Sequence, residues 1–288
     1  MKKTGGRVEG RLGTLAVDRP PDCRQGNSMD RWKFYDITHR DHLICNPTSV
    51  AKLDELIGLL DLGPEPRVLD IASGKGEFIV RVAERFGGPA GAGFHGVAVD
   101  ISPYCTADLR ARAAGRLPAA ALEVLEMDGA DYQPAEGSFD LASCMGGSWV
   151  FGGHRETLRY LARAVRPGGA VVAGQPFWRK EPAAEYLAWS GLKSDQFGSH
   201  ADNVEAGETE GLVPLLALVS SGDEWDRYET LQWRAAARYA DAHPDDPDVT
   251  ELLARVEHSR REYLNWGRDT LGWALYVFAT RRASHEGF

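Results

Sequence analysis

A glycine turn between a short apolar run and a longer amphipathic run constrains this chain more than any other feature. Residues 67–72 form an apolar run rich in strand formers, and apolar residues recur at helical spacing from Glu77 onward. The four residues 73–76, SGKG, separate the two runs. A strand, a tight turn and a helix in this order place backbone N–H groups at the carboxyl edge of a sheet. Parallel α/β folds bind nucleotide-like ligands at that edge.

Two positions narrow the choice of ligand. A dinucleotide fingerprint needs a third glycine three residues after Gly76, and that position is Ile79. Asp70, at the end of the predicted strand, would repel a pyrophosphate over the turn but can pair with an ammonium group. S-adenosyl-L-methionine carries an ammonium group and no phosphate, so the pattern favours this cofactor. A nucleotide-linked oxidoreductase on a similar sheet is the alternative.

Two further acidic residues follow predicted strands. Asp100 ends the buried run at 94–100, where a carboxylate can accept hydrogen bonds from both hydroxyls of a ribose. Asp128 follows the run at 122–127, so we expect it to accept from the adenine amino group while the backbone of Ala130 faces the ring. Since successive parallel strands end at one edge, the acids and the glycine turn predict a single site.

The remaining chain predicts four more strands and a series of helices. The predicted strands cover 139–144, 170–174, 212–220 and 271–280, and the predicted helices cover 50–62, 102–114, 154–165, 223–243 and 248–267. Residues 175–211 are less periodic. Pro214 places its strand near an edge of the sheet or at a strand start. The glycine-rich stretch 146–153 lets backbone approach a ligand, and its Trp149 offers a large face.

Length and composition bound the organisation. The 288 residues suffice for one large α/β domain, which we expect over residues 29–288. Residues 1–28 are rich in Gly, Arg and Pro without apolar periodicity, so we expect a flexible tail. The net charge of −9 argues against a nucleic-acid partner and favours a small-molecule substrate. No apolar run reaches the roughly 18 residues of a membrane span, so we expect no membrane partner and a cytoplasmic location. Four scattered cysteines show no metal-binding spacing, and no metal is expected.

The Asp-x-x-Ser-Gly-x-Gly pattern at 70–76 resembles the first motif of the class I S-adenosylmethionine-dependent methyltransferases. The turn LARAVRPGG at 161–169, before a buried strand, is a second feature of that family. From Asp30 onward the chain looks most similar to a ubiquinone-biosynthesis-like branch of bacterial small-molecule methyltransferases. The residues that carry this closer match are His39, His42, Asn46, Pro47, 147–153, 176–179, 224–229, Gly272 and Trp273.

The resemblance implies a Rossmann-like fold with a seven-stranded, mostly parallel sheet and helices on both faces. It also implies methyl transfer from S-adenosyl-L-methionine to a small molecule, with S-adenosyl-L-homocysteine as product. The cofactor contacts then expected are Asp70, Ala72, Ser73, Gly74, Gly76, Asp100, Ile101, Asp128, Gly129, Ala130, Met145 and Gly146. Ala72 and Lys75 depart from the residues usual at their positions. A non-catalytic regulator that binds the same cofactor is a further alternative.

Two segments outside the predicted strands are candidates for the acceptor site. We expect the N-terminal arm, 30–62, and the helical insertion, 223–267, to close over the acceptor, because methyl transfer must exclude water. His39 and His42 are three residues apart in the arm, so one of them is a candidate general base or orienting group. The aromatic residues expected in the acceptor pocket are Tyr35, Trp149, Trp178, Trp225, Tyr228 and Trp266. The sequence carries no signal of oligomeric state.

Overall fold

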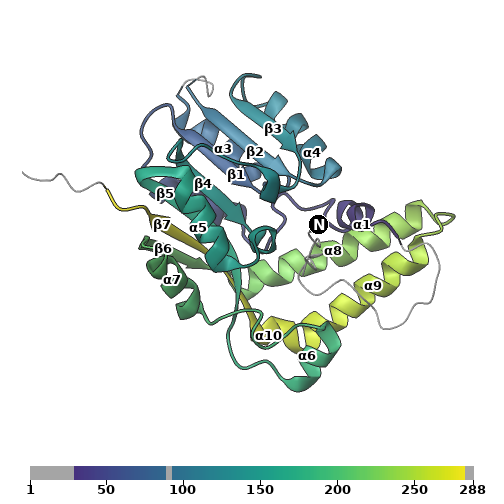
Figure 1. Ribbon diagram of the computed structural model, residues 1–288. Coiled ribbons are helices and arrows are strands. Elements are labelled where there is room, and N and C mark those ends of the chain that lie inside the picture. The colour runs from purple at the N-terminus through teal and green to yellow at the C-terminus, as the bar shows by residue number, and fades with distance from the viewer. Residues whose placement is uncertain (1–28, 89–92, 283–288) are drawn as a thin grey trace, which may run out of the picture.

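Seven strands form one sheet in the order β3-β2-β1-β4-β5-β7-β6 (Figure 1). The computed structural model describes residues 29–88 and 93–282, and the predicted tail at 1–28 lies outside them. Strands β1 to β5 run parallel, whereas β7 is antiparallel to both of its neighbours. The predicted fold class is therefore confirmed. The strands are β1 (Arg67–Ile71), β2 (His95–Asp100), β3 (Leu122–Glu126), β4 (Phe139–Met145), β5 (Val165–Trp178), β6 (Val213–Val219) and β7 (Leu271–Ala279).

Helices cover both faces of this sheet. They are α1 (Arg31–Thr38), α2 (Val50–Leu59), α3 (Glu77–Phe86), α4 (Pro103–Ala114), α5 (His154–Ala164), α6 (Ala184–Ser190), α7 (His200–Thr209), α8 (Gly222–Ala242), α9 (Val249–Glu262) and α10 (Arg268–Thr270). A π-helical turn, Tyr263–Gly267, joins α9 to α10. Helices α2, α3 and α4 share a core with one face, and α5 and α7 pack on the other.

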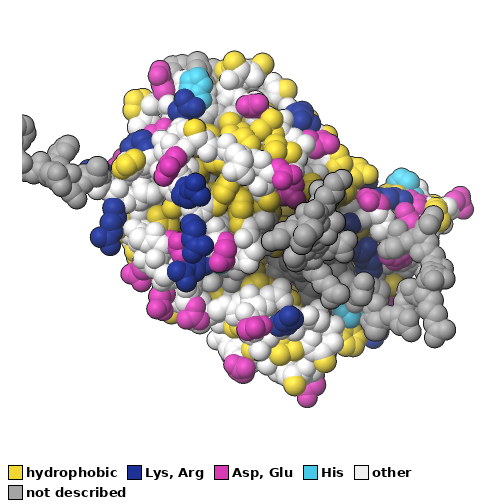
Figure 2. Space-filling model, viewed as in Figure 1, with side chains coloured by type: hydrophobic (Ala, Val, Ile, Leu, Met, Phe, Trp, Pro, Cys, Tyr) yellow, Lys and Arg dark blue, Asp and Glu magenta, His cyan; other side chains and the backbone are white. Residues whose placement is uncertain are grey.

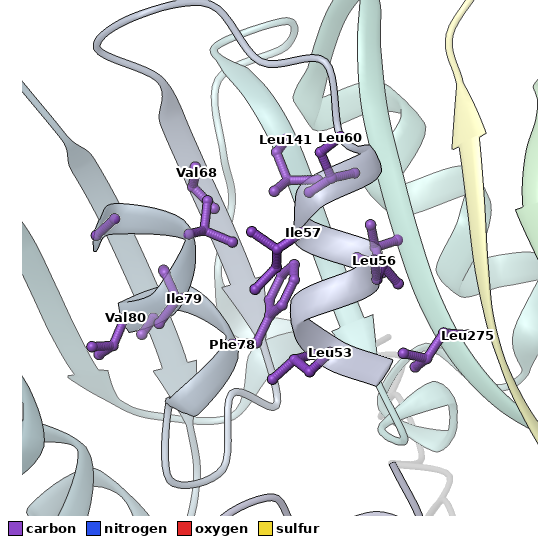
Figure 3. Close-up of a cluster of buried hydrophobic side chains, with 14 of the residues drawn as sticks. Leu53, Leu56, Ile57, Leu60, Val68, Phe78, Ile79, Val80, Leu141 and Leu275 are labelled. Atoms are coloured by element: carbon purple, nitrogen blue, oxygen red, sulfur yellow. The ribbon is translucent and has the colours of Figure 1, made fainter. Parts of the chain in front are cut away.

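Alternation along the strands divides the interior into two cores. Val68 and Leu69 of β1 are both fully buried, but they belong to different cores because successive side chains point to opposite faces. Figure 3 shows the first core, in which Leu53 and Ile57 of α2 lie beside Phe78 of α3. These contacts fix the helix that follows the glycine turn, and with it the turn itself.

Strand β5 is longer than the sequence predicted. The predicted strand at 170–174 is only its middle, because β7 pairs with it from Ala170 through Trp178. At the start of β5, the register of its pairing with β4 shifts between Phe139 and Leu141. Gly168 of β5 adopts a left-handed conformation there, with φ +79°. The predicted break at 166–169 is thus an irregularity within the strand.

Residues 175–220 contain two helices and an edge strand. The weakly periodic stretch contains α6 and α7, and α7 begins with a capping box between Ser199 and Asp202. Strand β6 is an edge strand, and its register with β7 shifts after Pro214, which confirms the position expected for that proline.

Helices α8 and α9 form an antiparallel pair that extends away from the sheet, with α1 beside α8 (Figure 1). A small apolar core joins these three helices through Phe34 and Ile37 of α1, Ala236 of α8, and Leu252 of α9. Lys52 of α2 forms an ion pair with Glu224 in the first turn of α8. No helix in the described part of the chain is both long enough and apolar enough to cross a membrane.

Candidate functional site

One cavity of about 290 Å³ lies between the carboxyl edge of the sheet and the helices α1, α8 and α9. Its sheet side is lined by the ends of β1, β2 and β4 and by the glycine turn, and its other wall carries aromatic residues of the three helices. Every residue predicted to contact the cofactor lines this cavity except Ala130. The structure therefore brings together the acids that sequence analysis assigned to the ends of successive strands.

The glycine turn is held in a left-handed backbone conformation at alternate residues. Ala72, Gly74 and Gly76 have φ values of +52°, +55° and +71°. Gly76 also packs against α4, because a Cβ atom there would lie 1.8 Å from the Cδ1 atom of Leu109. Ala72 adopts the same region with a Cβ atom, which costs roughly 1–2 kcal/mol relative to a right-handed conformation. Strain of this kind is concentrated at ligand-binding sites.

Lys75, the unusual residue of the turn, has a clear structural role. Its side chain is 6% exposed, and its Nζ atom donates to the backbone oxygen of His39 at 3.0 Å. The same atom forms an ion pair with Asp108 of α4, also at 3.0 Å. Lys75 thus connects the glycine turn to the N-terminal arm and to α4.

Asp100 orders the turn as well as facing the cavity. Its Oδ2 atom accepts from the backbone N–H of Gly74 at 2.7 Å, and Oδ1 accepts from Ser102 at 2.8 Å. Burial raises the pKa of this carboxyl, while backbone hydrogen bonds from Ser102, Gly74 and Ile101 act in the opposite direction. A carboxylate has about four acceptor positions, so acceptor capacity remains for a ligand.

Three buried polar atoms close to the turn have no partner among the described residues. They are Asp70 Oδ2, Ser73 Oγ and Asn46 Oδ1, and all three residues line the cavity. Asp70 is 1% exposed and its Oδ1 atom accepts from Ser143 at 2.7 Å. Burial raises the pKa of Asp70 to about 7. Unsatisfied buried polar atoms cost free energy, so this cluster is suited to a polar ligand.

At the other end of the sheet edge, Asp128 caps a short 3₁₀ turn, Gly129–Asp131. Its Oδ1 atom accepts from the backbone N–H of Ala130 at 3.0 Å, and the side chain is exposed at the cavity rim. Ala130 does not line the cavity, and its N–H donates to Asp128. The expectation that its backbone faces the adenine ring is therefore not supported by this geometry.

Comparison with known proteins agrees with this arrangement. A family model described as a methyltransferase domain matches residues 68–169. The crystal structure of an S-adenosylmethionine-dependent methyltransferase from Thiobacillus denitrificans, in complex with S-adenosyl-L-homocysteine, is 30% identical to this chain. It covers 88% of this chain and 100% of its own, with a TM-score of 0.78. The chain belongs to the class I S-adenosylmethionine-dependent methyltransferases.

Two further relatives resemble this methyltransferase over most of its length. A methyltransferase structure from Geobacter sulfurreducens, also in complex with S-adenosyl-L-homocysteine, is 29% identical and has a TM-score of 0.79 over 86% of this chain and 98% of that one. The uncharacterized protein YjhP of Escherichia coli (strain K12) is 29% identical over 255 residues, which is 88% of this chain and all of YjhP. S-adenosyl-L-methionine is therefore the cofactor of this methyltransferase.

The two histidines of the arm lie side by side, with ring centroids 4.9 Å apart. His39 is held at both nitrogens. Nδ1 lies 3.2 Å from the carbonyl oxygen of Tyr35, which can only accept, so Nε2 accepts from the Tyr228 hydroxyl at 3.0 Å. His42 donates through Nε2 to the Tyr228 carbonyl at 2.8 Å and does not line the cavity.

Burial makes both imidazoles weak bases in the methyltransferase. It lowers the pKa of His39 to about 3, with the neighbouring His42 adding to the effect. Burial also lowers the pKa of His42. Neither ring thus has a free basic nitrogen directed at the cavity with a pKa suited to proton abstraction near neutral pH.

Four of the six predicted acceptor-pocket aromatics line the cavity of the methyltransferase: Tyr35, Trp149, Trp225 and Tyr228. Trp178 and Trp266 do not. Trp178 donates to the Ser194 carbonyl at 2.9 Å and packs edge-on against Phe197. Trp266 stacks on Tyr186, so it supports a cavity wall from behind. Both predictions were wrong because an aromatic residue near a site is often part of the packing around it.

Sequence analysis missed several polar residues of the helical wall. Glu229 and Gln232 of α8 and Ser259 and Glu262 of α9 line the cavity. Helical spacing is the signal for the two residues of α8, since residues 225, 229 and 232 share a helical face, but the predicted acceptor pocket contains only aromatic residues.

The cysteines also proved less isolated than their spacing suggested. The thiols of Cys45 and Cys105 are hydrogen-bonded to each other and line the cofactor side of the cavity. This contact joins the arm to the first turn of α4, and nothing in the sequence pattern indicates it.

Proposed function

We propose that this methyltransferase methylates a small-molecule acceptor bound between the glycine turn and the helices α1, α8 and α9. The observation that carries the proposal is the continuity of the cavity. The same cavity is lined by Asp100 and Gly74 at the sheet edge and by Trp225 and Tyr228 at the helical wall. On the face drawn in Figure 2, Lys and Arg lie among Asp and Glu without forming a continuous basic area. That distribution favours a small acceptor over a nucleic acid.

The unpartnered atoms beside the turn fit the amino-acid end of the cofactor. Asp70 Oδ2 and Asn46 Oδ1 can accept from its ammonium group, and Ser73 Oγ can donate to its carboxylate. Asp100 retains acceptor capacity for the ribose hydroxyls beyond its backbone hydrogen bonds. Asp128 uses one oxygen for Ala130 and retains the other for the adenine amino group.

When bound, S-adenosyl-L-methionine supplies a methyl group on a good leaving group, so the chain needs no nucleophile of its own. The residues around the cavity have to exclude water and align the acceptor with the methyl carbon. We propose that the arm at 30–62 and the insertion at 223–267 do this as a lid on a single domain, 29–288. The small apolar core shared by α1, α8 and α9 supports this role.

We propose that His39 acts as a positioning residue and not as the base. Its Nε2 atom accepts a hydrogen bond from the Tyr228 hydroxyl, which fixes the phenol ring at the cavity wall. The phenol oxygen can then accept a hydrogen bond from the molecule that is methylated. His42 holds the backbone of the same tyrosine. Both histidines then orient Tyr228, and neither removes a proton.

The test is an activity screen with radiolabelled S-adenosyl-L-methionine and a fractionated small-molecule extract. We expect S-adenosyl-L-homocysteine to form together with a labelled small product, and neither to form with Asp100→Ala. Transfer of the labelled methyl group only to protein or nucleic acid, or cofactor binding without any turnover, would overturn the proposal.

The ionisation of Asp70 predicts a pH-dependent affinity for S-adenosyl-L-homocysteine. Without ligand, burial favours the protonated acid up to a pKa of about 7, whereas pairing with an ammonium group requires the carboxylate. Binding below pH 7 must therefore remove a proton from Asp70, and affinity should rise about tenfold between pH 6 and pH 8. Calorimetry over this range checks the rise. Asp70→Asn should bind more weakly and lose most of the pH dependence, and an unchanged profile in this variant would remove Asp70 from the ammonium site.

A further inference from the structure

Two carboxyl groups line the helical wall of the cavity, with no cation paired to them in the described part of the chain. Glu229 of α8 is half-buried, Glu262 of α9 is 9% exposed, and both line the cavity. They are close enough that the charge of Glu262 raises the pKa of Glu229. Among the described residues, neither forms an ion pair, and Glu229 has no hydrogen-bond partner. Glu262 accepts a hydrogen bond from the Tyr186 hydroxyl.

The cationic residues that line the same cavity are engaged elsewhere. Lys75 is paired with Asp108, and Arg31 lies over the ring of Trp32, 4.5 Å from its centroid. The two glutamates thus lack an internal counter-ion within the described residues. Burial raises the pKa of each to about 8, as expected for carboxyl groups in a cavity without a compensating charge.

Aromatic rings and unpartnered polar atoms surround these carboxyls. Trp225 stacks with Tyr263 at 6.3 Å between centroids and meets Tyr228 edge-on at the same distance. Trp225 is 4% exposed, lines the cavity, and has an indole N–H without a partner among the described residues. The Oγ atom of Ser259, one turn before Glu262, is also buried and unpartnered. A wall of aromatic faces with acidic groups between them is suited to an organic cation.

We propose that the methyl acceptor is an amine, and that its protonated nitrogen is bound by Glu229 and Glu262 between the rings of Trp225, Tyr228 and Tyr263. A cation between the two carboxyl groups stabilises their ionised form, which burial alone disfavours, and satisfies the free oxygens of Glu229. The Trp225 N–H and Ser259 hydroxyl then provide hydrogen bonds to a polar atom on the same molecule. This inference rests on the proposed function, because it assigns a substrate class to the same cavity.

The test measures binding of benzylamine and of the neutral, similarly shaped benzyl alcohol to protein saturated with S-adenosyl-L-homocysteine, by ligand-observed NMR at pH 7. We expect benzylamine to bind at least about tenfold more tightly than the alcohol. Glu229→Gln and Glu262→Gln should each abolish this preference. The control variants Asp241→Asn on α8 and Glu257→Gln on α9 remove an exposed carboxylate from the same helices and should leave it intact.

Equal binding of amine and alcohol to the wild-type protein, or an amine preference that survives both glutamine variants, would overturn the inference. Thermal unfolding confirms that each variant is folded, and the wild-type comparison decides the question even where one variant is not. Affinity for S-adenosyl-L-homocysteine should be unchanged in both variants. If the amine preference is absent but the activity screen shows methylation of a small molecule, only the amine class of substrate is rejected. If the screen shows no turnover, the proposed function itself is rejected.

Discussion

Replacing Asp100 by alanine is expected to lower the affinity for S-adenosyl-L-homocysteine about 100-fold, or roughly 3 kcal/mol. Two losses contribute. The hydrogen bonds proposed for the ribose hydroxyls disappear. The backbone N–H of Gly74 also loses its acceptor, the Asp100 Oδ2 atom at 2.7 Å, which holds the glycine turn. Isothermal titration calorimetry measures the change. Asp100→Asn keeps one acceptor oxygen, so we expect it to fall between the wild-type protein and the alanine variant.

Glu126→Ala provides the matched control. Glu126 ends β3 directly opposite Asp100 in the parallel register, but it does not line the cavity. We therefore expect its removal to leave cofactor affinity close to that of the wild-type protein. Equal affinity in Asp100→Ala and Glu126→Ala, with both proteins folded, would exclude Asp100 from the ribose site.

Local patterns predicted the cofactor half of this molecule well. The alternation of apolar runs and helical periods placed all seven strands, and an acidic residue at or just beyond the end of each of the first three strands is a short-range feature. Because parallel strands end at one edge, the position of Asp70, Asp100 and Asp128 at one cavity followed from strand order alone. Pro214 marked an edge strand for an equally local reason, its missing N–H.

The helical half could not be predicted in the same way, because its contacts join distant parts of the chain. His39 and Tyr228 are 189 residues apart, and their hydrogen bond occupies the Nε2 atom of an imidazole whose pKa burial lowers to about 3. The spacing of the two histidines predicted that they lie on one face, yet it did not indicate burial. Likewise, Glu229 and Glu262 lie on separate helices, and only the packing of α8 against α9 turns two ordinary helical glutamates into a pair.

Replacing Gly76 by alanine is expected to destabilise the fold by about 3 kcal/mol and to weaken cofactor binding. Alanine at φ +71° costs about 1 kcal/mol through its backbone conformation. Its Cβ atom would also lie 1.8 Å from Leu109 Cδ1 and 2.8 Å from Cγ, and Leu109 is fully buried. Forcing an extra carbon into such a contact adds roughly 1–3 kcal/mol. Urea unfolding measures the total.

Gly88→Ala separates the two contributions. Gly88 follows α3 with φ +68°, nearly the same backbone conformation, but a Cβ atom there would meet no described atom within 4 Å. We expect Gly88→Ala to lose only the conformational part, about 1 kcal/mol. The clash itself is tested by combining Gly76→Ala with Leu109→Ala. Since the second substitution removes the obstructing atoms, the double variant should be more stable than the sum of the two single effects predicts, by at least about 1 kcal/mol. Strict additivity would show that the close packing of the turn against α4 does not explain why glycine occupies position 76.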